Sequence, residues 1–184
     1  MTEKTELRRK IRAWRRSLPK DEKQKLDDSI FENVFAHPWL KEADTVLLYC
    51  SIPEEPDTQK ILDRLLLENI PVALPVCLES GIMKFYLLHD RNKLQTGNYY
   101  NIPEPIGRDE PILTEKTVCI VPALAFTPKG ERLGQGGGYY DRFLELYPRL
   151  RTIGITYHAM LQESLPCEEH DLPVKVVITD ESWR

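Results

Sequence analysis

The sequence lacks the features that mark secreted, membrane-bound or metal-stabilised proteins. Its four cysteines are widely spaced and form no Cys-x-x-Cys pair, which argues against a disulfide framework. Its four histidines show no metal-ligand spacing, so a zinc site is not expected. No stretch approaches the ~20 apolar residues of a membrane span, and the N-terminus has no apolar signal core. We therefore expect a cytoplasmic protein with reduced thiols and no membrane association.

An excess of positive charge is also missing. The formal net charge of 184 residues is −4, which argues against general nucleic-acid binding. The composition, 41% hydrophobic and 29% charged, fits one domain spanning residues 1–184. A chain of this length buries about 70% of its unfolded surface, so it folds without disulfides or a structural metal. Positive charge is in excess only in residues 1–16, which hold seven Lys or Arg and two Glu.

Glycine is scarce except in one segment. Four of the nine glycines lie between Gly134 and Gly138, and apolar residues then recur at helical spacing at Tyr140, Phe143, Leu144 and Tyr147. Clustered glycines permit positive φ angles and a close approach of backbone N–H groups to a ligand. A glycine-rich loop that runs into a helix N-terminus, here at about Gly138, binds anions. This segment is the best candidate for a phosphate site.

The glycine-rich loop is neither of the two common nucleotide motifs. A Walker loop needs Gly-Lys-Ser/Thr, but Gly138 is followed by Tyr139. The dinucleotide fingerprint also fails, because Tyr139 stands where its third glycine belongs. Asp141, in the first turn of the expected helix, either stabilises the helix dipole or binds magnesium beside a phosphate. We favour the magnesium ligand.

The remaining pattern predicts an α/β fold. Apolar runs typical of buried strands occupy residues 45–50, 72–75, 83–88, 117–122, 152–156 and 174–178. A helix from about Thr58 joins the first two runs into a βαβ unit. Two amphipathic helices precede the first strand. We therefore predict a single three-layer domain, with a mainly parallel sheet flanked by helices and an N-terminal helical pair.

Three segments carry polar or aromatic residues whose role the pattern leaves open. The loop after Cys50 holds Glu54, Glu55 and Asp57; we expect Asp57 to cap the following helix, Glu54 to be solvated, and Glu55 to be either solvated or ligand-binding. The aromatic loop at residues 97–105 either forms a wall for a planar ligand or packs over the sheet edge. The first helix has a basic stripe, made of Lys4, Arg8, Arg12 and Arg15. A solvated face, a nucleic-acid arm, a transit peptide and an anion site compete for this stripe, and the residues alone favour the solvated face.

Residues 130–141 carry a family resemblance. They read Gly-x-Arg-Leu-Gly-x-Gly-x-Gly-Tyr-Tyr-Asp, which resembles the signature of the 5-formyltetrahydrofolate cyclo-ligases. The resemblance extends more loosely over the whole chain. It implies an ATP- and magnesium-dependent conversion of 5-formyltetrahydrofolate to 5,10-methenyltetrahydrofolate, with release of ADP and phosphate. It also implies a fold of the sugar-phosphate isomerase and CoA-transferase-like group.

The resemblance implies roles for individual residues. Arg8 and Arg132 would be catalytic, and Mg²⁺ would be held by Asp141 and Asp171. ATP would contact Lys4, Arg8, Arg132, Leu133, Gly134, Gln135, Gly136, Gly137, Gly138, Tyr139 and Tyr140. The folate would contact Cys50, Glu55, Tyr100, Gln135, Gly136, Gly137, Gly138 and Tyr139. Some family members have lysine where this chain has Gly137, which leaves Lys4 or Arg8 with more of the phosphate charge to neutralise.

Two other classes of function use the same kind of loop. A sugar-phosphate isomerase would need an anion site but neither ATP nor magnesium. A non-catalytic sensing domain would bind a phosphorylated metabolite and release it unchanged. Neither needs two metal-directed carboxylates, so Asp141 and Asp171 favour the cyclo-ligase. We expect a monomer whose partners are ATP and the folate alone.

Overall fold

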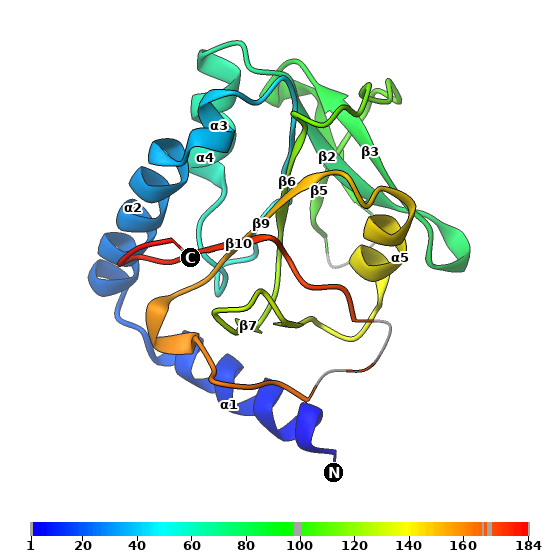
Figure 1. Cartoon of the computed structure of the whole chain (residues 1–184). Helices are drawn as coiled ribbons and strands as arrows, with labels where there is room; N and C mark the ends of the chain where they lie inside the picture. Colours follow the sequence, from blue (N-terminus) through cyan, green and yellow to red (C-terminus); the bar gives the residue numbers. More distant parts are fainter. Residues whose placement is uncertain (1, 98–100, 167, 169–170, 184) are drawn as a thin grey trace.

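The computed structural model describes residues 2–97, 101–166, 168 and 171–183, and a six-stranded sheet lies at its centre (Figure 1). The strands are β1 (Val46–Leu47), β2 (Val72–Cys77), β3 (Met83–Leu88), β6 (Val118–Val121), β9 (Arg151–Ile155) and β10 (Val176–Ile178). They lie in the order β10-β9-β6-β1-β2-β3. All neighbours pair in parallel except β2 and β3, which are antiparallel. The predicted mainly parallel sheet is confirmed.

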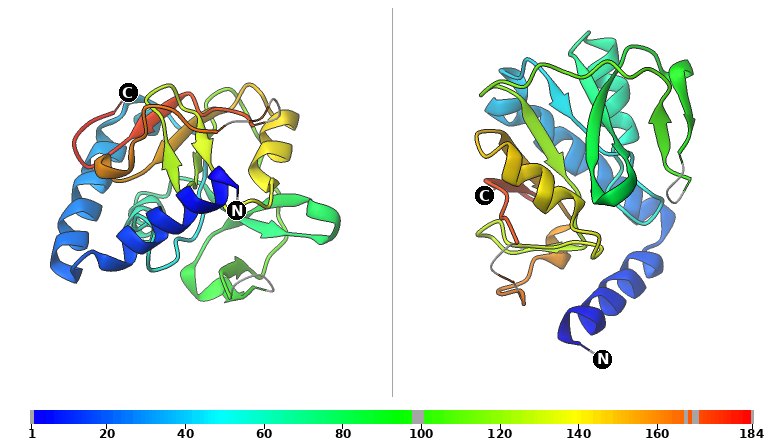
Figure 2. Two further views of the ribbon diagram at one scale, coloured as in Figure 1. Left: turned by 90° about the horizontal axis from the view of Figure 1, so that it is seen from below. Right: turned by 90° about the vertical axis from the view of Figure 1, so that its right-hand side faces the viewer.

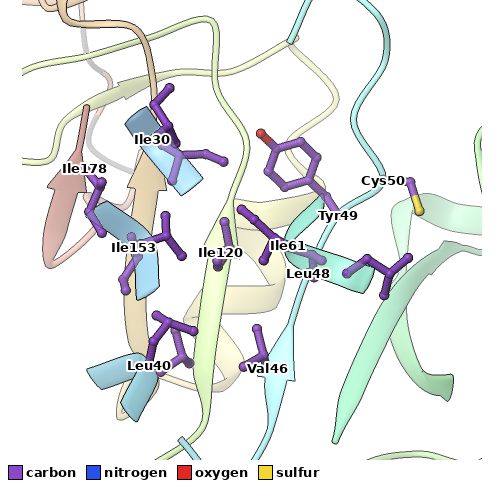
Figure 3. Close-up of a cluster of buried hydrophobic side chains, with 14 of the residues drawn as sticks. Ile30, Leu40, Val46, Leu48, Tyr49, Cys50, Ile61, Ile120, Ile153 and Ile178 are labelled. Carbon is purple, nitrogen blue, oxygen red and sulfur yellow. The ribbon is translucent and has the colours of Figure 1, made fainter. Parts of the chain in front are cut away.

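Helices cover both faces of this sheet. In β6, Val118 and Ile120 belong to one buried cluster, whereas Cys119 and Val121 belong to another. The first cluster packs against α2 (Lys20–Ala36), α3 (Pro38–Lys41) and α4 (Gln59–Leu67), and the second against α5 (Tyr139–Leu146). Figure 3 shows part of the first cluster, in which Ile30 of α2 and Ile61 of α4 lie in one group with strand side chains such as Ile120. Because both faces are buried, the strands appear in the sequence as continuous apolar runs.

Helix α1 (Glu3–Ser17) lies across the end of the sheet where the parallel strands finish (Figures 1 and 2). Its apolar face packs on the core through buried Ile11 and half-buried Leu7 and Trp14. The side chain of Arg15 donates to the carbonyls of Ala123 and Leu124, directly after β6. The predicted N-terminal helical pair is therefore confirmed as α1 and α2. None of the helices that the structure describes is long and apolar enough to cross a membrane.

The structure adds two small hairpins that the sequence pattern did not indicate. One pairs β4 (Leu94–Thr96) with β5 (Pro103–Pro105), and the other pairs β7 (Ala125–Phe126) with β8 (Arg132–Leu133). Strands of two or three residues are too short to show an alternating pattern. β1 is also shorter than the predicted 45–50, although residues 46–50 are all buried.

The expected cap of α4 is displaced by one residue. The helix begins at Gln59, with Thr58 as its boundary residue, but the Thr58 side chain makes no capping hydrogen bond. Instead the Asp57 carboxylate accepts from the Gln59 backbone N–H at 2.8 Å. Asp57 therefore satisfies a free N–H group at the helix start, as predicted, from just outside it.

Candidate active site

The glycine-rich loop connects β8 to α5 and supplies the backbone of the site. Gly136 and Gly138 have φ angles of 104° and 65°, which only glycine adopts without strain. Gly138 is the residue before α5, so the predicted helix start is confirmed. Gly136 and Gly137 are exposed, so the loop presents backbone to solvent at the N-terminus of a helix. This is the geometry of an anion site.

The basic stripe of α1 packs against this loop. Arg8 Nε donates to the Gly134 carbonyl at 2.9 Å, and Arg12 Nη2 donates to Gln135 Oε1 at 2.5 Å. A Cβ atom at Gly136 would lie 3.6 Å from Arg8 Nη2. The prediction of a solvated face, which the residues alone favoured, is therefore wrong for buried Arg15 and half-buried Arg8, whereas Arg12 is exposed although it contacts Gln135. Guanidinium groups held beside exposed backbone N–H groups favour the alternative of an anion site.

Arg142 of α5 fixes the other side of the loop. Its guanidinium donates to the Gly137 carbonyl at 2.7 Å and to the Gly81 carbonyl at 2.9 Å, and it lies over the Tyr139 ring at 5.3 Å. A Cβ atom at Gly138 would lie 2.7 Å from Arg142 Nη1, so a side chain there would displace this guanidinium, in addition to the strain of the positive φ angle. Sequence reasoning missed Arg142, because only the folded loop brings Gly81 near α5.

Of the two carboxylates predicted to bind magnesium, Asp141 contacts the backbone of Leu172, the residue that follows Asp171. Asp141 Oδ1 accepts from the Leu172 N–H at 3.1 Å and from Arg132 Nη2, while Arg132 Nε donates to the Leu172 carbonyl at 3.2 Å. Asp171, the preceding residue in the chain, accepts from Lys4 Nζ at 3.0 Å. Lys4 also pairs with Glu168 at 2.7 Å. Each carboxylate is thus held beside one of the cations predicted to contact phosphate.

This donor set fits magnesium. Mg²⁺ takes oxygen ligands, keeps several waters, and is bound in phosphate sites by one or two carboxylates together with phosphate oxygens. Asp141 and Asp171 supply two carboxylates beside the glycine-rich loop. Among the described residues there is no cluster of three or more His, Cys, Asp or Glu, so a metal cage made of protein alone is not present there. An ion here would need phosphate oxygens or waters to complete its shell.

A second polar region follows β1. Glu55 is 8% exposed, and its Oε2 accepts from the Ile52 N–H at 3.1 Å. Burial raises the pKa of Glu55, whereas the hydrogen bond from Ile52, the charge of Arg15 and a hydrogen bond from the Gln135 side chain oppose the rise. Glu55 lies on the wall of an open cleft of about 530 Å³, lined by Lys20, Lys23, Gln24, Asp27, Ser51, Ile52, Pro53, Glu55, Asp57, Gln59 and Pro103. A cleft of this size accommodates a small organic ligand.

Two residues predicted to contact the folate or ATP, Cys50 and Leu133, are buried. Cys50 is 4% exposed, and burial raises its pKa to about 11, so it is a poor nucleophile and can only line a pocket. Leu133 is a core residue at 3% exposure, so only its backbone could face a nucleotide. Tyr139 is half-buried over Arg142. Tyr100 lies outside the described residues.

The Tyr140 side chain packs with the residues that cover the α5 face of the sheet, with its ring 6.5 Å from that of Phe85, and its hydroxyl is the notable group. It is buried and has no hydrogen-bond partner among the described residues. Burial raises the pKa of Tyr140 well above its ordinary value, and the groups that act on it electrostatically are Cys119, Tyr49, Cys77 and Glu55. Tyr140, predicted to contact ATP, therefore has a buried hydroxyl that no described residue satisfies.

A buried network around Asp27 holds the loop that carries Glu55. Asp27 accepts from the Tyr157 hydroxyl at 2.8 Å, from Lys23 Nζ at 2.6 Å and from the Asp57 N–H at 3.2 Å. Asp27 and Tyr157 are both buried. Sequence reasoning missed this network, because its members lie on α2, on the loop and after β9. The only sign in the sequence is a carboxylate, Asp27, next to the apolar Leu26 on an amphipathic helix.

Comparison with known proteins decides the family. A family model described as the 5-formyltetrahydrofolate cyclo-ligase family matches residues 1–180. The chain belongs to this family. Among curated relatives, the Escherichia coli 5-formyltetrahydrofolate cyclo-ligase is 34% identical over 175 residues, covering 92% of this chain and 96% of the relative. The Haemophilus influenzae protein of the same name is 31% identical over 176 residues, covering 92% and 93%.

Solved structures agree with the observed fold. The structure of 5,10-methenyltetrahydrofolate synthetase from Aquifex aeolicus superposes with a TM-score of 0.85 at 32% identity, covering 100% of this chain and 92% of that one. A synthetase from Mycoplasma pneumoniae gives a TM-score of 0.75 at 23% identity, covering 97% and 99%, and supports the fold alone. The family resemblance of residues 130–141, the α/β class and the ligase class of enzyme are confirmed. The roles of individual residues stay predictions.

Proposed function

We propose that the protein converts 5-formyltetrahydrofolate to 5,10-methenyltetrahydrofolate, coupled to hydrolysis of ATP to ADP and phosphate. The observation that carries this proposal beyond family membership is the packing of the α1 arginines on the glycine-rich loop. Arg8 and Arg12 are bonded to the loop, and two carboxylates, Asp141 and Asp171, accept from other cations, Arg132 and Lys4 respectively, which supports a site for phosphate and a metal ion. A sugar-phosphate isomerase needs no such pair of carboxylates.

The reaction requires activation of an unreactive amide. The formyl group of the substrate is an amide on a ring nitrogen, and its oxygen is a poor leaving group. Transfer of the γ-phosphoryl group of ATP to this oxygen forms a phosphate ester and releases ADP. The neighbouring aniline nitrogen then attacks the activated carbon, its proton passes to solvent, and phosphate leaves as the five-membered ring closes. The protein mainly positions the reactants and neutralises charge, as in other phosphoryl transfers.

The phosphates of ATP would bind to the N–H groups of residues 134–138 and to Arg8. In the structure, Lys4 pairs with Asp171, and Arg132 pairs with Asp141. Asp141 and Asp171 would hold Mg²⁺, which supplies further neutralisation of phosphate charge when bound. Arg132 Nη1 lies next to Gly134, 3.5 Å from where a Cβ atom would be, so it can reach a phosphate in the loop without moving far.

The folate would occupy the region of Glu55. A pterin presents adjacent N–H donors on its pyrimidinone edge, and an ionised carboxylate accepts two such bonds side by side. Cys50 would line this region, and Tyr139, half-buried at the start of α5, would contact the folate from the loop side. No residue is required as a covalent nucleophile, which agrees with the suppressed thiolate of Cys50.

The test is formation of the methenyl product, followed by its ultraviolet absorbance, with and without ATP in the presence of magnesium. We expect product only with ATP, and loss of at least about a hundredfold in rate in Asp141→Ala. Glu145→Gln, an exposed carboxylate one turn along the same helix, is the matched control and should retain the rate. A folded protein that binds ATP but forms no product would refute the proposal, and turnover of sugar phosphates without ATP would replace it.

We further propose that the enzyme acts as a monomer in the cytoplasm. Cys50, Cys77 and Cys119 are free thiols, which suits a reducing compartment.

A further inference from the structure

The cleft beside Glu55 has acidic and basic residues on different walls. The loop after β1 supplies Glu55 and Asp57, and the start of α2 supplies Lys20 and Lys23. None of the residues of the glycine-rich loop, 134–138, is among the described residues that line this cleft. An anion bound by the lysines of α2 would therefore be a different group from the phosphates proposed for the loop.

Of the charged residues that line the cleft, Lys20 is the one without a partner in the described part of the chain. Lys23 Nζ pairs with Asp27 at 2.6 Å. The carboxylates of Glu55 and Asp57 each accept from a backbone N–H group. Lys20 is exposed, and it has no hydrogen bond or ion pair with any described residue. Folding thus leaves its ammonium group free to bind a ligand.

Helix stability does not explain a lysine at position 20. Lys20 is the first residue of α2, where the positive end of the helix dipole lies. A cation at this position lowers the stability of the helix, whereas the acidic residues of the same turn, Asp21 and Glu22, raise it. A charge that opposes the local rule and has no partner in the described fold points to binding.

Exposure increases from Glu55 to the lysines. Glu55 is 8% exposed, the Lys23 side chain is 21% exposed, and Lys20 is fully at the surface. The folate substrate has a matching order of groups. Its pterin carries N–H donors suited to a buried carboxylate, whereas its glutamyl group, at the opposite end, carries two carboxylates that are costly to bury. A folate whose pterin contacts Glu55 would direct its glutamyl group toward the open part of the cleft.

We propose that Lys20 binds the glutamyl carboxylates of the folate and so makes the enzyme prefer substrates that carry this group. The inference rests on the proposed function, which places the pterin at Glu55. Lys20 is then a specificity-determining residue that lies away from the reacting atoms. Its contribution belongs to the KM for the folate rather than to kcat. Lys23 contributes less, because it is already paired with Asp27.

The decisive experiment combines the variant Lys20→Gln with two substrates. One is 5-formyltetrahydrofolate, and the other is 5-formyltetrahydropteroate, which has the same pterin, formyl and aniline groups but lacks the glutamyl group. The matched control is Lys25→Gln, which removes an exposed lysine of the same helix that does not line the cleft. Lys20→Glu tests reversal of the charge. Both Lys20 variants should fold, because they remove a cation from the positive end of α2, and denaturant unfolding verifies this.

We expect the wild-type KM for the folate to be about fivefold lower than that for the pteroate, the scale of an exposed ion pair. In Lys20→Gln the KM for the folate should rise about fivefold, while that for the pteroate stays the same. Lys20→Glu should raise the KM for the folate further, because like charges repel. Lys25→Gln should leave both values unchanged. The wild-type preference should weaken at high salt, which screens exposed charges.

The outcomes separate this inference from the proposed function. If the protein binds both compounds but forms no methenyl product, the proposed function fails, and equilibrium binding of the two compounds to wild type and Lys20→Gln still decides the inference. The inference is wrong if Lys20→Gln weakens both compounds equally, or if Lys25→Gln weakens the folate as much. A higher KM for ATP in Lys20→Gln would overturn it too, because Lys20 would then bind phosphate. If neither compound binds, both proposals are wrong.

Discussion

The two regions of the site handle charge in opposite ways. In the phosphate region, Lys4 and Arg132 are paired with the carboxylates of Asp171 and Asp141, and Arg8 is bonded to a backbone carbonyl of the loop. In the folate region, Glu55 is buried and accepts from the Ile52 backbone N–H, and the opposite charge that acts on it, Arg15, is bonded to carbonyls after β6. Paired charges can exchange partners when a ligand arrives. A buried carboxylate with few partners is instead fixed in advance for one kind of ligand.

The pKa shifts express the same contrast. Burial would lower the pKa of Lys4, but its hydrogen bonds to Glu168 and Asp171 prevail and raise it, so folding stabilises the charged form. Burial raises the pKa of Glu55, so folding destabilises its charged form. The phosphate region is therefore electrostatically satisfied, while the folate region stores an unfavourable interaction. Such stored free energy is typical of binding sites, where function opposes stability.

The largest change in substrate KM is expected for ATP from Arg8→Ala, in the phosphate region. This change removes a cation beside the loop and the hydrogen bond to the Gly134 carbonyl. We expect the KM for ATP to rise about 30- to 100-fold, because hydrogen bonds to charged groups contribute about 2–3 kcal/mol. The KM for the folate should change much less. Steady-state kinetics with each substrate varied in turn measure both values.

The matched control for this prediction is Arg9→Ala, an exposed arginine that is the next residue of α1. It removes the same charge from the same helix and should leave the KM for ATP within about twofold of wild type. Equal effects of the two variants would show that the loop responds only to total charge. Unchanged ATP kinetics in Arg8→Ala would refute a phosphate role for Arg8.

A smaller effect is expected in the folate region from Glu55→Gln. This change should weaken folate binding and increase the stability of the folded protein. A Gln side chain can still accept from the Ile52 N–H, but it presents a single acceptor to the pterin. We expect the KM for the folate to rise about tenfold and the KM for ATP to change little. The folded protein should become more stable at neutral pH, because the buried negative charge is gone.

The sign of this stability change follows from linkage. A carboxyl whose pKa is raised by folding contributes stability that is present below its unfolded pKa of about 4.3 and is lost as the pH rises through the folded value. Glu55→Gln should therefore stabilise the protein near pH 7 and have little effect near pH 4. Denaturant unfolding of both proteins at the two pH values measures this difference. If Glu55→Gln lowers the free energy of unfolding at pH 7 while the control Glu54→Gln leaves it unchanged, the Glu55 carboxylate has favourable partners in the fold and the prediction is wrong.

The contrast between the regions also explains what the sequence could predict. The phosphate region rests on a contiguous segment, residues 130–141, so its loop and helix start were visible in the sequence. Contacts between distant parts of the chain were not visible in either region: Arg8 meets Gly134 across 126 positions beside the loop, and Tyr157 meets Asp27 across 130 near Glu55. No spacing in a single sequence encodes such pairs. The strands were predictable because burial on both faces leaves continuous apolar runs, whereas hairpins of two or three residues leave no periodicity.

The stripe of α1 shows why a local pattern can mislead. Lys4, Arg8, Arg12 and Arg15 recur every three or four residues, as on a solvated helix face. In the fold, this face lies against the glycine-rich loop, and Arg15 is only 3% exposed. Periodicity tells which residues share a face, but not what that face contacts. The family resemblance pointed to the anion site because it carries information from many folded chains.

The smallest effect is expected from Tyr157→Phe, which tests how rigidly the folate region is held. The Tyr157 hydroxyl donates to Asp27, and Asp27 in turn accepts from the backbone of Asp57, at the end of the loop that carries Glu55. Removal of the hydroxyl leaves Asp27 with Lys23 and Asp57 as partners, so we expect a loss of about 1–2 kcal/mol in the free energy of unfolding.

The effect of Tyr157→Phe on binding should be confined to one region. Loosening of the 51–57 loop should raise the KM for the folate about twofold, while the KM for ATP stays at the wild-type value, because α1 and the glycine-rich loop keep their own contacts. Kinetics combined with denaturant unfolding of the same preparation measure both quantities. Equal changes in the two KM values would mean that the Asp27 network supports the whole site. The distinction between a folate region that is fixed in advance and a phosphate region whose charges exchange partners would then be wrong.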